Sequence, residues 1–182
     1  IKTICVGNIY IGGTGKTPFC IELNDILKNL NFKTAIIKKF YKDQLDEQRL
    51  INNKNKLYFE KNRIESIKKA IKDKNDIVIL DDGLQEKKLS YDISFVCFNI
   101  TKWIGNGFLL PAGPLREQLK RINSCQMVVI NGKRNITFER KLKSISNNIK
   151  IYQSKYEIKN IKKYKGKKIL AFAGIGNPEG FF

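Results

Sequence analysis

The stretch Tyr10-Ile-Gly-Gly-Thr-Gly-Lys-Thr17 joins an apolar segment, residues 1–6, to a segment with helical spacing, residues 17–30. It matches the phosphate-binding pattern G-x-x-x-x-G-K-[ST] except that Tyr10 replaces the first glycine. In such a loop, glycines let backbone N–H groups face phosphate oxygens, and the following helix adds its positive end. The alternative is a glycine-rich turn that joins a strand to a helix and binds nothing.

An acidic pair, Asp81-Asp82, follows the apolar run Ile77–Leu80 and precedes Gly83. Carboxylates at the end of a strand suit Mg²⁺ beside bound phosphates, although Asp-Gly also favours a plain turn. Because both motifs follow strand-like segments, we favour a nucleotide site. Lys16 would then reach the β- and γ-phosphates, and the Thr17 hydroxyl would hold Mg²⁺.

Strand-like and helical segments alternate along the chain, which predicts an α/β fold: a P-loop NTPase-like three-layer sandwich with a mostly parallel sheet. Ligands bind such sheets at the carboxyl ends of the strands. After residue 150 the pattern changes, so we expect an ATP-binding kinase domain over 1–150, and over 151–182 an extended linker and the start of a truncated second lobe. Strands are expected over 1–6, 34–40, 56–60, 76–80, 93–98 and 127–130, and helices over 17–30, 63–72, 115–122 and 140–145.

The 182 residues carry a formal net charge of +18, which suits an anionic partner but also suits the lysine bias of an AT-rich genome. The lysines are dispersed and only six of the 35 basic residues are arginine, which argues against nucleic acid as a partner. The four cysteines lack C-x-x-C spacing and histidine is absent, which argues against a zinc site or a disulfide framework. The first and last residues suggest an internal piece of a longer protein.

Four motifs together resemble the tetraacyldisaccharide 4′-kinase family, the lipid A kinases of Gram-negative bacteria. They occur in the order of that family and span nearly the whole chain. The loop of the family also lacks the first glycine, so Tyr10 is a family variant. The motifs are Val6-Gly-Asn-Ile-Tyr-Ile-Gly-Gly-Thr-Gly-Lys-Thr-Pro18, Leu80-Asp-Asp-Gly-Leu-Gln85, Gly105-Asn-Gly-Phe-Leu-Leu-Pro-Ala-Gly-Pro-Leu-Arg-Glu117 and Phe172-Ala-Gly-Ile-Gly-Asn-Pro-Glu179.

This resemblance implies transfer of the γ-phosphate of Mg·ATP to the 4′-hydroxyl of tetraacyldisaccharide 1-phosphate. ATP and Mg²⁺ are the implied cofactors. The implied location is the cytoplasmic face of the inner membrane, with the lipid substrate and an anionic membrane surface as partners and no nucleic acid. We also expect a monomer.

The resemblance also implies roles for individual residues. Lys16, Arg116 and Asp46 are the catalytic candidates, with Asp46 as the base for the sugar hydroxyl. A solvated acid in the polar stretch 41–48 is the simpler explanation for Asp46, and helix capping is the simpler explanation for Glu117. The expected ATP-binding residues are Tyr10, Ile11, Gly12, Gly13, Thr14, Gly15, Lys16, Thr17 and Gln85, and the expected metal ligands are Thr17, Asp81, Asp82 and Glu117.

Two departures from the family pattern affect the surroundings of the base. Glu86 replaces a histidine, and Lys39–Lys42 replaces an Arg-Gly-Tyr-Gly segment. The histidine partner of the family's base and its membrane anchor lie outside these residues. A P-loop ATPase or GTPase switch is the alternative function, but Val129–Lys133 lacks the aspartate of a guanine-reading motif.

Overall fold

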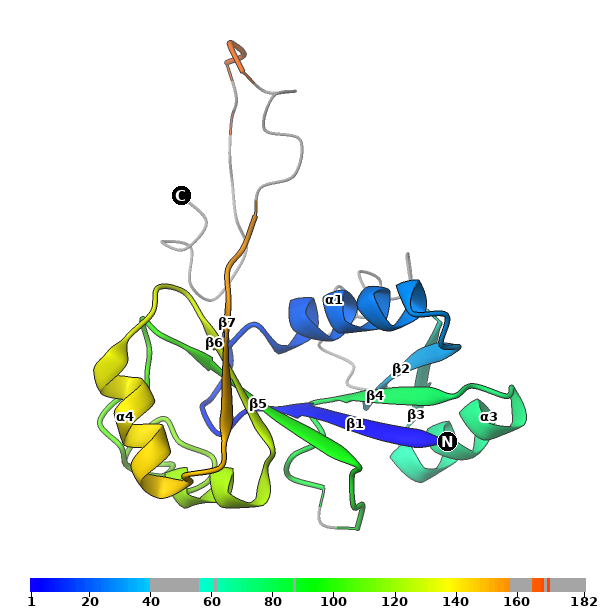
Figure 1. The fold of residues 1–182 in the computed structure, drawn as a ribbon, viewed down its shortest axis with the longest axis horizontal. Helices are drawn as coiled ribbons and strands as arrows, with labels where there is room; N and C mark the ends of the chain where they lie inside the picture. Colours follow the sequence, from blue (N-terminus) through cyan, green and yellow to red (C-terminus); the bar gives the residue numbers. More distant parts are fainter. Residues whose placement is uncertain (40–55, 61, 87, 158–164, 169, 171–182) are drawn as a thin grey trace.

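A computed structural model describes residues 1–39, 56–60, 62–86, 88–157, 165–168 and 170. Within these ranges one seven-stranded sheet forms, with the order β3-β2-β4-β1-β5-β6-β7 and every neighbouring pair parallel (Figure 1). The strands are β1 Lys2–Gly7, β2 Thr34–Lys39, β3 Leu57–Glu60, β4 Ile77–Asp81, β5 Ile93–Asn99, β6 Met127–Asn131 and β7 Lys150–Ser154.

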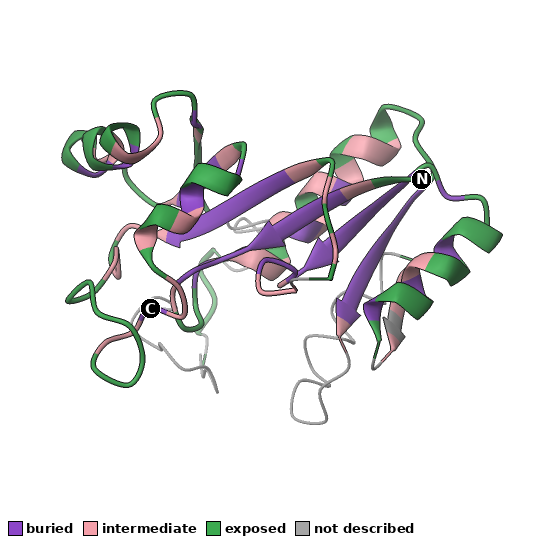
Figure 2. Cartoon of the chain, turned by 90° about the horizontal axis from the view of Figure 1, so that it is seen from below, coloured by how far each residue is buried: buried purple, intermediate pink, exposed green. Residues whose placement is uncertain are grey.

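Helices cover both faces of this sheet. The helix α1 (Lys16–Asn29) lies on one face, and α3 (Arg63–Lys72) and α4 (Ile136–Ile145) lie on the other. Asparagine side chains at positions 62 and 135 accept backbone hydrogen bonds at the first turns of α3 and α4, which fixes where these helices begin. Seen from below, the strands are buried between partly exposed helices, as in a three-layer sandwich (Figure 2).

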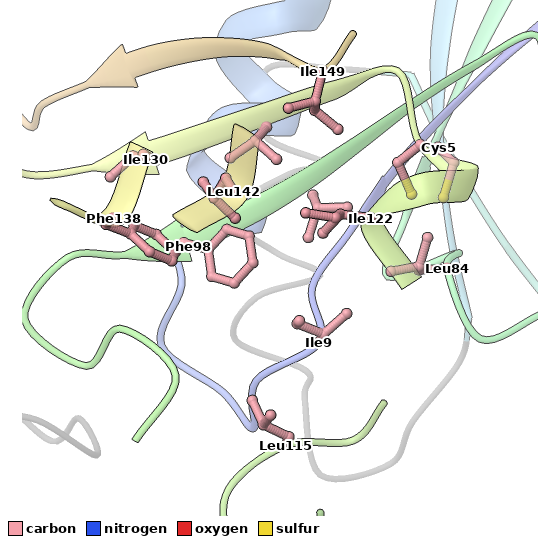
Figure 3. Packing of buried hydrophobic residues seen from close by; sticks show 13 residues of the cluster. Cys5, Ile9, Leu84, Phe98, Leu115, Ile122, Ile130, Phe138, Leu142 and Ile149 are labelled. Carbon is pink, nitrogen blue, oxygen red and sulfur yellow. The ribbon is translucent and has the colours of Figure 1, made fainter. Parts of the chain in front are cut away.

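Alternate residues of the central strands supply two apolar layers, because successive side chains of a strand point to opposite faces. In β1, Ile4 and Val6 pack on the α1 side, whereas Cys5 packs on the other side. The larger core, drawn in Figure 3, joins Phe98 of β5 to Phe138 of α4, whose rings meet edge to face with centroids 5.1 Å apart. All four cysteine thiols are buried and free.

The predicted α/β class and parallel sheet are confirmed, and all six expected strands form within one or two residues of their predicted bounds. The expected helix over 115–122 is wrong at its start. Leu115 instead bridges Tyr10, and the backbone N–H groups of Leu115 and Arg116 donate to carbonyls of Phe108 and Ile9. Those bonds hold the backbone extended there, and only a short 3₁₀ helix, Leu119–Ser124, follows.

Two further boundaries differ from expectation. The helix α4 begins at Ile136 rather than at Arg140, because Asn135 caps it. The strand β7 pairs with β6 through residues 150–154, so the sheet extends beyond residue 150, where the sequence pattern changes. The rest of 151–182 lies largely outside the described residues, and the division into two units stays a prediction. Among the described residues, no helix has the length and apolar character needed to cross a bilayer.

The strand order positions the site. The strand β1 is central, with β4 on one side and β5 on the other, and Val6 pairs with Asp81. The loop after β1 and the acidic pair at the end of β4 therefore meet at the carboxyl edge of the sheet, as predicted.

Candidate functional site

The glycine-rich loop after β1 forms a cradle at this edge. Gly12, Gly13 and Gly15 have φ angles of 60°, 60° and 85°, in the left-handed region that glycine adopts readily. The helix α1 begins at Lys16 without a side-chain cap, which leaves its first N–H groups for a ligand. A cavity of about 390 Å³ opens over the loop, and we call it the phosphate cavity; its lining is Ile11, Gly12, Gly13, Thr14, Gly15, Lys16, Thr17, Pro18, Lys38, Lys39, Arg63, Asp81, Asp82, Arg116 and Tyr156.

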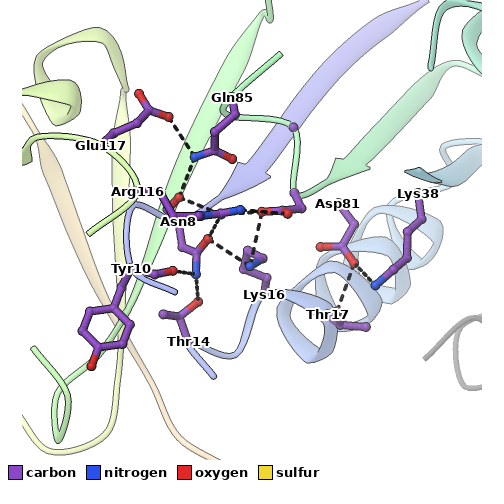
Figure 4. Close-up of polar contacts among 12 residues, drawn as sticks. Asn8, Tyr10, Thr14, Lys16, Thr17, Lys38, Asp81, Gln85, Arg116 and Glu117 are labelled. Atoms are coloured by element: carbon purple, nitrogen blue, oxygen red, sulfur yellow. Dashed lines mark hydrogen bonds and ion pairs between the residues drawn. The ribbon is translucent and has the colours of Figure 1, made fainter. Parts of the chain in front are cut away.

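Tyr10, the residue that replaces glycine, does not line this cavity. It forms a bridge with Leu115, and its ring lies 5.9 Å from the Lys102 ammonium. The ring points away from the polar contacts of the loop (Figure 4), so a side chain at this position leaves the cradle open. Of the residues expected to bind ATP, those from Ile11 to Thr17 line the cavity, whereas Tyr10 does not, and its backbone carbonyl accepts a hydrogen bond from Asn8.

Asn8, which the sequence patterns do not single out, connects the parts of the site. Its fully buried Nδ2 donates to the Tyr10 carbonyl at 2.6 Å and to Thr14 Oγ1 at 2.9 Å. Its Oδ1 accepts from Lys16 Nζ at 2.9 Å, and its backbone carbonyl accepts from Arg116 Nη2 at 3.0 Å. The sequence places Asn8 within the first family motif and directly after a buried strand, but neither feature indicates this role.

Asp82 contacts two positively charged side chains that line the cavity. Its Oδ1 lies 3.3 Å from Lys16 Nζ and 2.7 Å from Arg116 Nη2, and its Oδ2 accepts from Arg116 Nη1 at 3.1 Å. Burial on its own would raise the pKa of Asp82, but the Arg116 hydrogen bonds and the Lys16 charge outweigh it and lower the pKa to about 2. The carboxylate is therefore charged at neutral pH and aims both cations at the cavity.

Asp81 lies beside it in a drier environment. Thr17 Oγ1 donates to Asp81 Oδ2 at 3.0 Å, and Lys38 Nζ contacts the same oxygen at 3.2 Å. The other oxygen, Oδ1, is buried and has no hydrogen-bond partner among the described residues. A buried, unpartnered carboxylate oxygen next to a threonine hydroxyl suits Mg²⁺, because this hard cation prefers oxygen ligands.

The described side chains alone do not complete a metal site. In the part of the chain that the structure describes, no cluster of three or more His, Cys, Asp or Glu side chains could hold a metal. Asp81 and Thr17 would supply two of the oxygen ligands of such a metal.

Gln85 and Glu117 lie just behind the cavity. Gln85 Nε2 donates to the Asn8 carbonyl at 2.9 Å and to Glu117 Oε1 at 2.8 Å, and Glu117 Oε2 contacts Arg121 Nε at 3.0 Å. Neither residue lines the cavity, and Glu117 does not open a helix. In this structure the pair braces Asn8 and, through it, the phosphate loop.

Arg63 is a second residue that the sequence patterns missed. It is the first residue of α3 and is buried, and its Nη2 donates to the backbone carbonyls of Asp81 and Asp82 at 2.9 and 2.8 Å. These two hydrogen bonds fix the backbone that carries the acidic pair, and Arg63 also lines the cavity. Sequence periodicity shows only that Arg63 begins an amphipathic helix. Asp46, the candidate base, lies outside the described residues.

A second cavity of about 580 Å³ adjoins the first across Gly15. Asn131 Nδ2 and Tyr156 Oη would each lie only 3.1 Å from a Cβ atom at Gly15, which already has a φ of 85°. Glycine therefore lets Asn131, at the end of β6, and Tyr156, which follows β7, approach the loop. The lining is Gly15, Pro18, Phe19, Glu22, Asn131, Ser154, Lys155, Tyr156 and Glu157.

Comparison with solved structures identifies the fold. An LpxK structure from Aquifex aeolicus in complex with ATP aligns with a TM-score of 0.63 and 20% identity, over 93% of this chain and 75% of that chain. HypB from Helicobacter pylori in complex with nickel aligns with a TM-score of 0.62 and 15% identity, over 85% of this chain and 79% of that chain. At these identities the likeness shows the fold alone, a P-loop NTPase-like sandwich.

Comparison of sequences identifies the family. The tetraacyldisaccharide-1-P 4′-kinase family model matches residues 1–182. The tetraacyldisaccharide 4′-kinase of Pelagibacter ubique is 45% identical, over 100% of this chain and 59% of that protein. That of Rickettsia bellii is 34% identical, over 100% of this chain and 61% of that protein, so the chain spans less than two thirds of these relatives. The chain belongs to the tetraacyldisaccharide-1-P 4′-kinase family.

Proposed function

We propose that the protein containing this chain transfers the γ-phosphate of Mg·ATP to the 4′-hydroxyl of tetraacyldisaccharide 1-phosphate, a step in lipid A biosynthesis. One observation carries the proposal: in a chain of this family, Lys16, Thr17, Arg116 and the acidic pair converge on a single cavity over the glycine-rich loop. Phosphoryl transfer needs mainly positioned charge, and this cavity supplies it.

The cavity residues divide the work by charge. Lys16 and Arg116, both held by Asp82, would contact phosphate oxygens and stabilise the charge that spreads over them during transfer. Thr17 and Asp81 would hold Mg²⁺ through the hydroxyl and the unpartnered carboxylate oxygen. Magnesium, when bound, neutralises charge on the β- and γ-phosphates. The base and ribose of the nucleotide would extend into the second cavity, whose volume suits such a ligand.

The acceptor side rests on other residues. Asp46 is the proposed base for the sugar hydroxyl, since a carboxylate suits a late proton acceptor. A lipid contact is supported by the 105–115 loop, which exposes Phe108, Leu109 and Leu110 by 63%, 40% and 49%. The loop is joined to the phosphate loop by the hydrogen bond from Ile11 N to the Pro114 carbonyl at 2.9 Å. The exposed apolar side chains of this loop and the net charge of +18 together support a location at the cytoplasmic face of the inner membrane.

A P-loop ATPase or GTPase switch is not favoured. Family membership points to a kinase, and the segment after β6 lacks the aspartate of a guanine-reading motif.

The test uses the whole protein with γ-labelled ATP, Mg²⁺ and tetraacyldisaccharide 1-phosphate in detergent. We expect label in the lipid, a loss of at least about a hundredfold in Lys16→Ala, because one preorganised charge contact is removed from the transition state, and no change in Lys72→Ala, an exposed residue of α3. Asp46→Ala tests the base separately. Hydrolysis of ATP without label in the lipid would contradict the proposed acceptor.

A further inference from the structure

Lys38 is an unusual residue for its place in the fold. It lies in β2 directly after Ala35, Ile36 and Ile37, which are fully buried, and it is itself only 5% exposed. Lysine is rarely buried without an acidic partner, because removing an ammonium from water is costly. A buried lysine at the end of an apolar strand therefore requires a specific compensating contact.

Asp81 provides that contact by register. The strands β2 and β4 are parallel neighbours, and Lys38 pairs with Asp81 across them. The ammonium lies 3.2 Å from Asp81 Oδ2, the oxygen that also accepts from Thr17 Oγ1 (Figure 4). The pair is thus built by the sheet and does not depend on a flexible surface side chain.

Lys38 contacts Asp81 directly, and Thr17 donates to the same Asp81 oxygen. Asp81 and Thr17 are the two residues that fit Mg²⁺. Lys38 also lines the phosphate cavity. A purely structural ion pair would need no access to the cavity, whereas Lys38 faces it from the side of the acidic pair.

We propose that Lys38 makes metal binding depend on the nucleotide. Without nucleotide, its ammonium holds Asp81 and cancels the charge that would attract a free divalent cation. When Mg·ATP enters, phosphate oxygens offer Lys38 a new partner inside the same cavity, and Asp81 and Thr17 become available to the metal. Lys38 is thus a positioning residue that favours entry of metal and nucleotide together. This inference rests on the proposed use of Mg·ATP, but not on the identity of the acceptor.

The test measures Mn²⁺ binding to the whole protein by electron paramagnetic resonance, with and without a non-hydrolysable ATP analogue. In Lys38→Met we expect Mn²⁺ to bind about tenfold more tightly than in wild type without nucleotide, because the competing charge is gone. We expect Mn²⁺ and the analogue together to bind about tenfold more weakly, because one phosphate contact is lost. Lys38→Arg should stay close to wild type in both assays.

Lys72→Met is the control, because it removes one positive charge at an exposed position of α3 that does not line the phosphate cavity. It should leave the nucleotide-free Mn²⁺ affinity within about twofold of wild type, since it changes only distant screened charge. Urea unfolding confirms that each variant is folded; if Lys38→Met is not, Lys38→Gln takes its place. Equal nucleotide-free affinities in wild type and the folded, uncharged variant would overturn the role of Lys38. Failure of wild type to bind the analogue at all would instead overturn the proposed function.

Discussion

Asp82 keeps its charge at the base of the phosphate cavity because Arg116 and Lys16 contact it. Burial alone would raise its pKa, and the two cations lower that pKa to about 2. We predict that Arg116→Gln raises the pKa of Asp82 toward its ordinary value, because the burial and the Lys16 contact remain while two hydrogen bonds and a charge are lost. Titration of the carboxyl carbon by NMR measures this directly, and an unchanged midpoint would show that Arg116 does not control Asp82.

The same shift makes stability depend on pH. The pKa of Asp82 is lower in the folded state than the value of about 3.9 in an unfolded chain, so its stabilisation is present above that value. It is lost as the pH falls through the folded value of about 2. The difference in the free energy of unfolding between wild type and Asp82→Asn should therefore shrink as the pH falls from about 3.9 to about 2.

The sequence predicts those site residues that belong to one continuous motif. Lys16 and Thr17 follow from the loop pattern, and the acidic pair follows from the end of a strand. Asn8, Lys38 and Arg63 could not be found in this way. Their roles depend on which strands and helices are neighbours in space, and no local pattern reports that.

Backbone hydrogen bonds within residues 105–115 hold the 105–115 loop in one shape. Leu115 N donates to the Phe108 carbonyl at 3.1 Å, and Leu110 N donates to the Leu115 carbonyl at 2.9 Å. These bonds fix Phe108 and Leu110 in exposed positions on a loop that leads directly into Arg116. The same bonds explain why the helix expected from Leu115 does not form, since tertiary pairing of the backbone overrides apolar spacing.

This loop yields a membrane prediction. In the whole protein, the double variant Phe108→Ser with Leu110→Ser should reduce binding to phosphatidylglycerol vesicles by about tenfold, because two apolar side chains are lost from the contact. Cosedimentation measures the effect, and ATP affinity should not change. Ile136→Ser is the control, since Ile136, at the start of α4, has an exposure between those of Phe108 and Leu110. An equal loss in the control would mean that general hydrophobicity, and not this loop, sets binding.

At the scale of the whole molecule, the alternation of strands and helices predicts the α/β class, but it leaves the strand order open. The order matters, because it places β4 beside β1 and β2 beside β4. These two neighbours bring Asp81 to the phosphate loop and Lys38 to Asp81. The net charge of +18 adds a long-range attraction to anionic surfaces, which salt would weaken.

The most direct measurement is the ³¹P NMR spectrum of the lipid after incubation of tetraacyldisaccharide 1-phosphate with the whole protein and Mg·ATP. A kinase built on this cavity predicts a second phosphate monoester signal, coupled to the proton at the 4′ position, in equal amount to the ADP formed. Lys16→Ala should give neither product. A spectrum that keeps only the 1-phosphate signal while ADP accumulates, or a new phosphate at another hydroxyl, would contradict the proposed reaction.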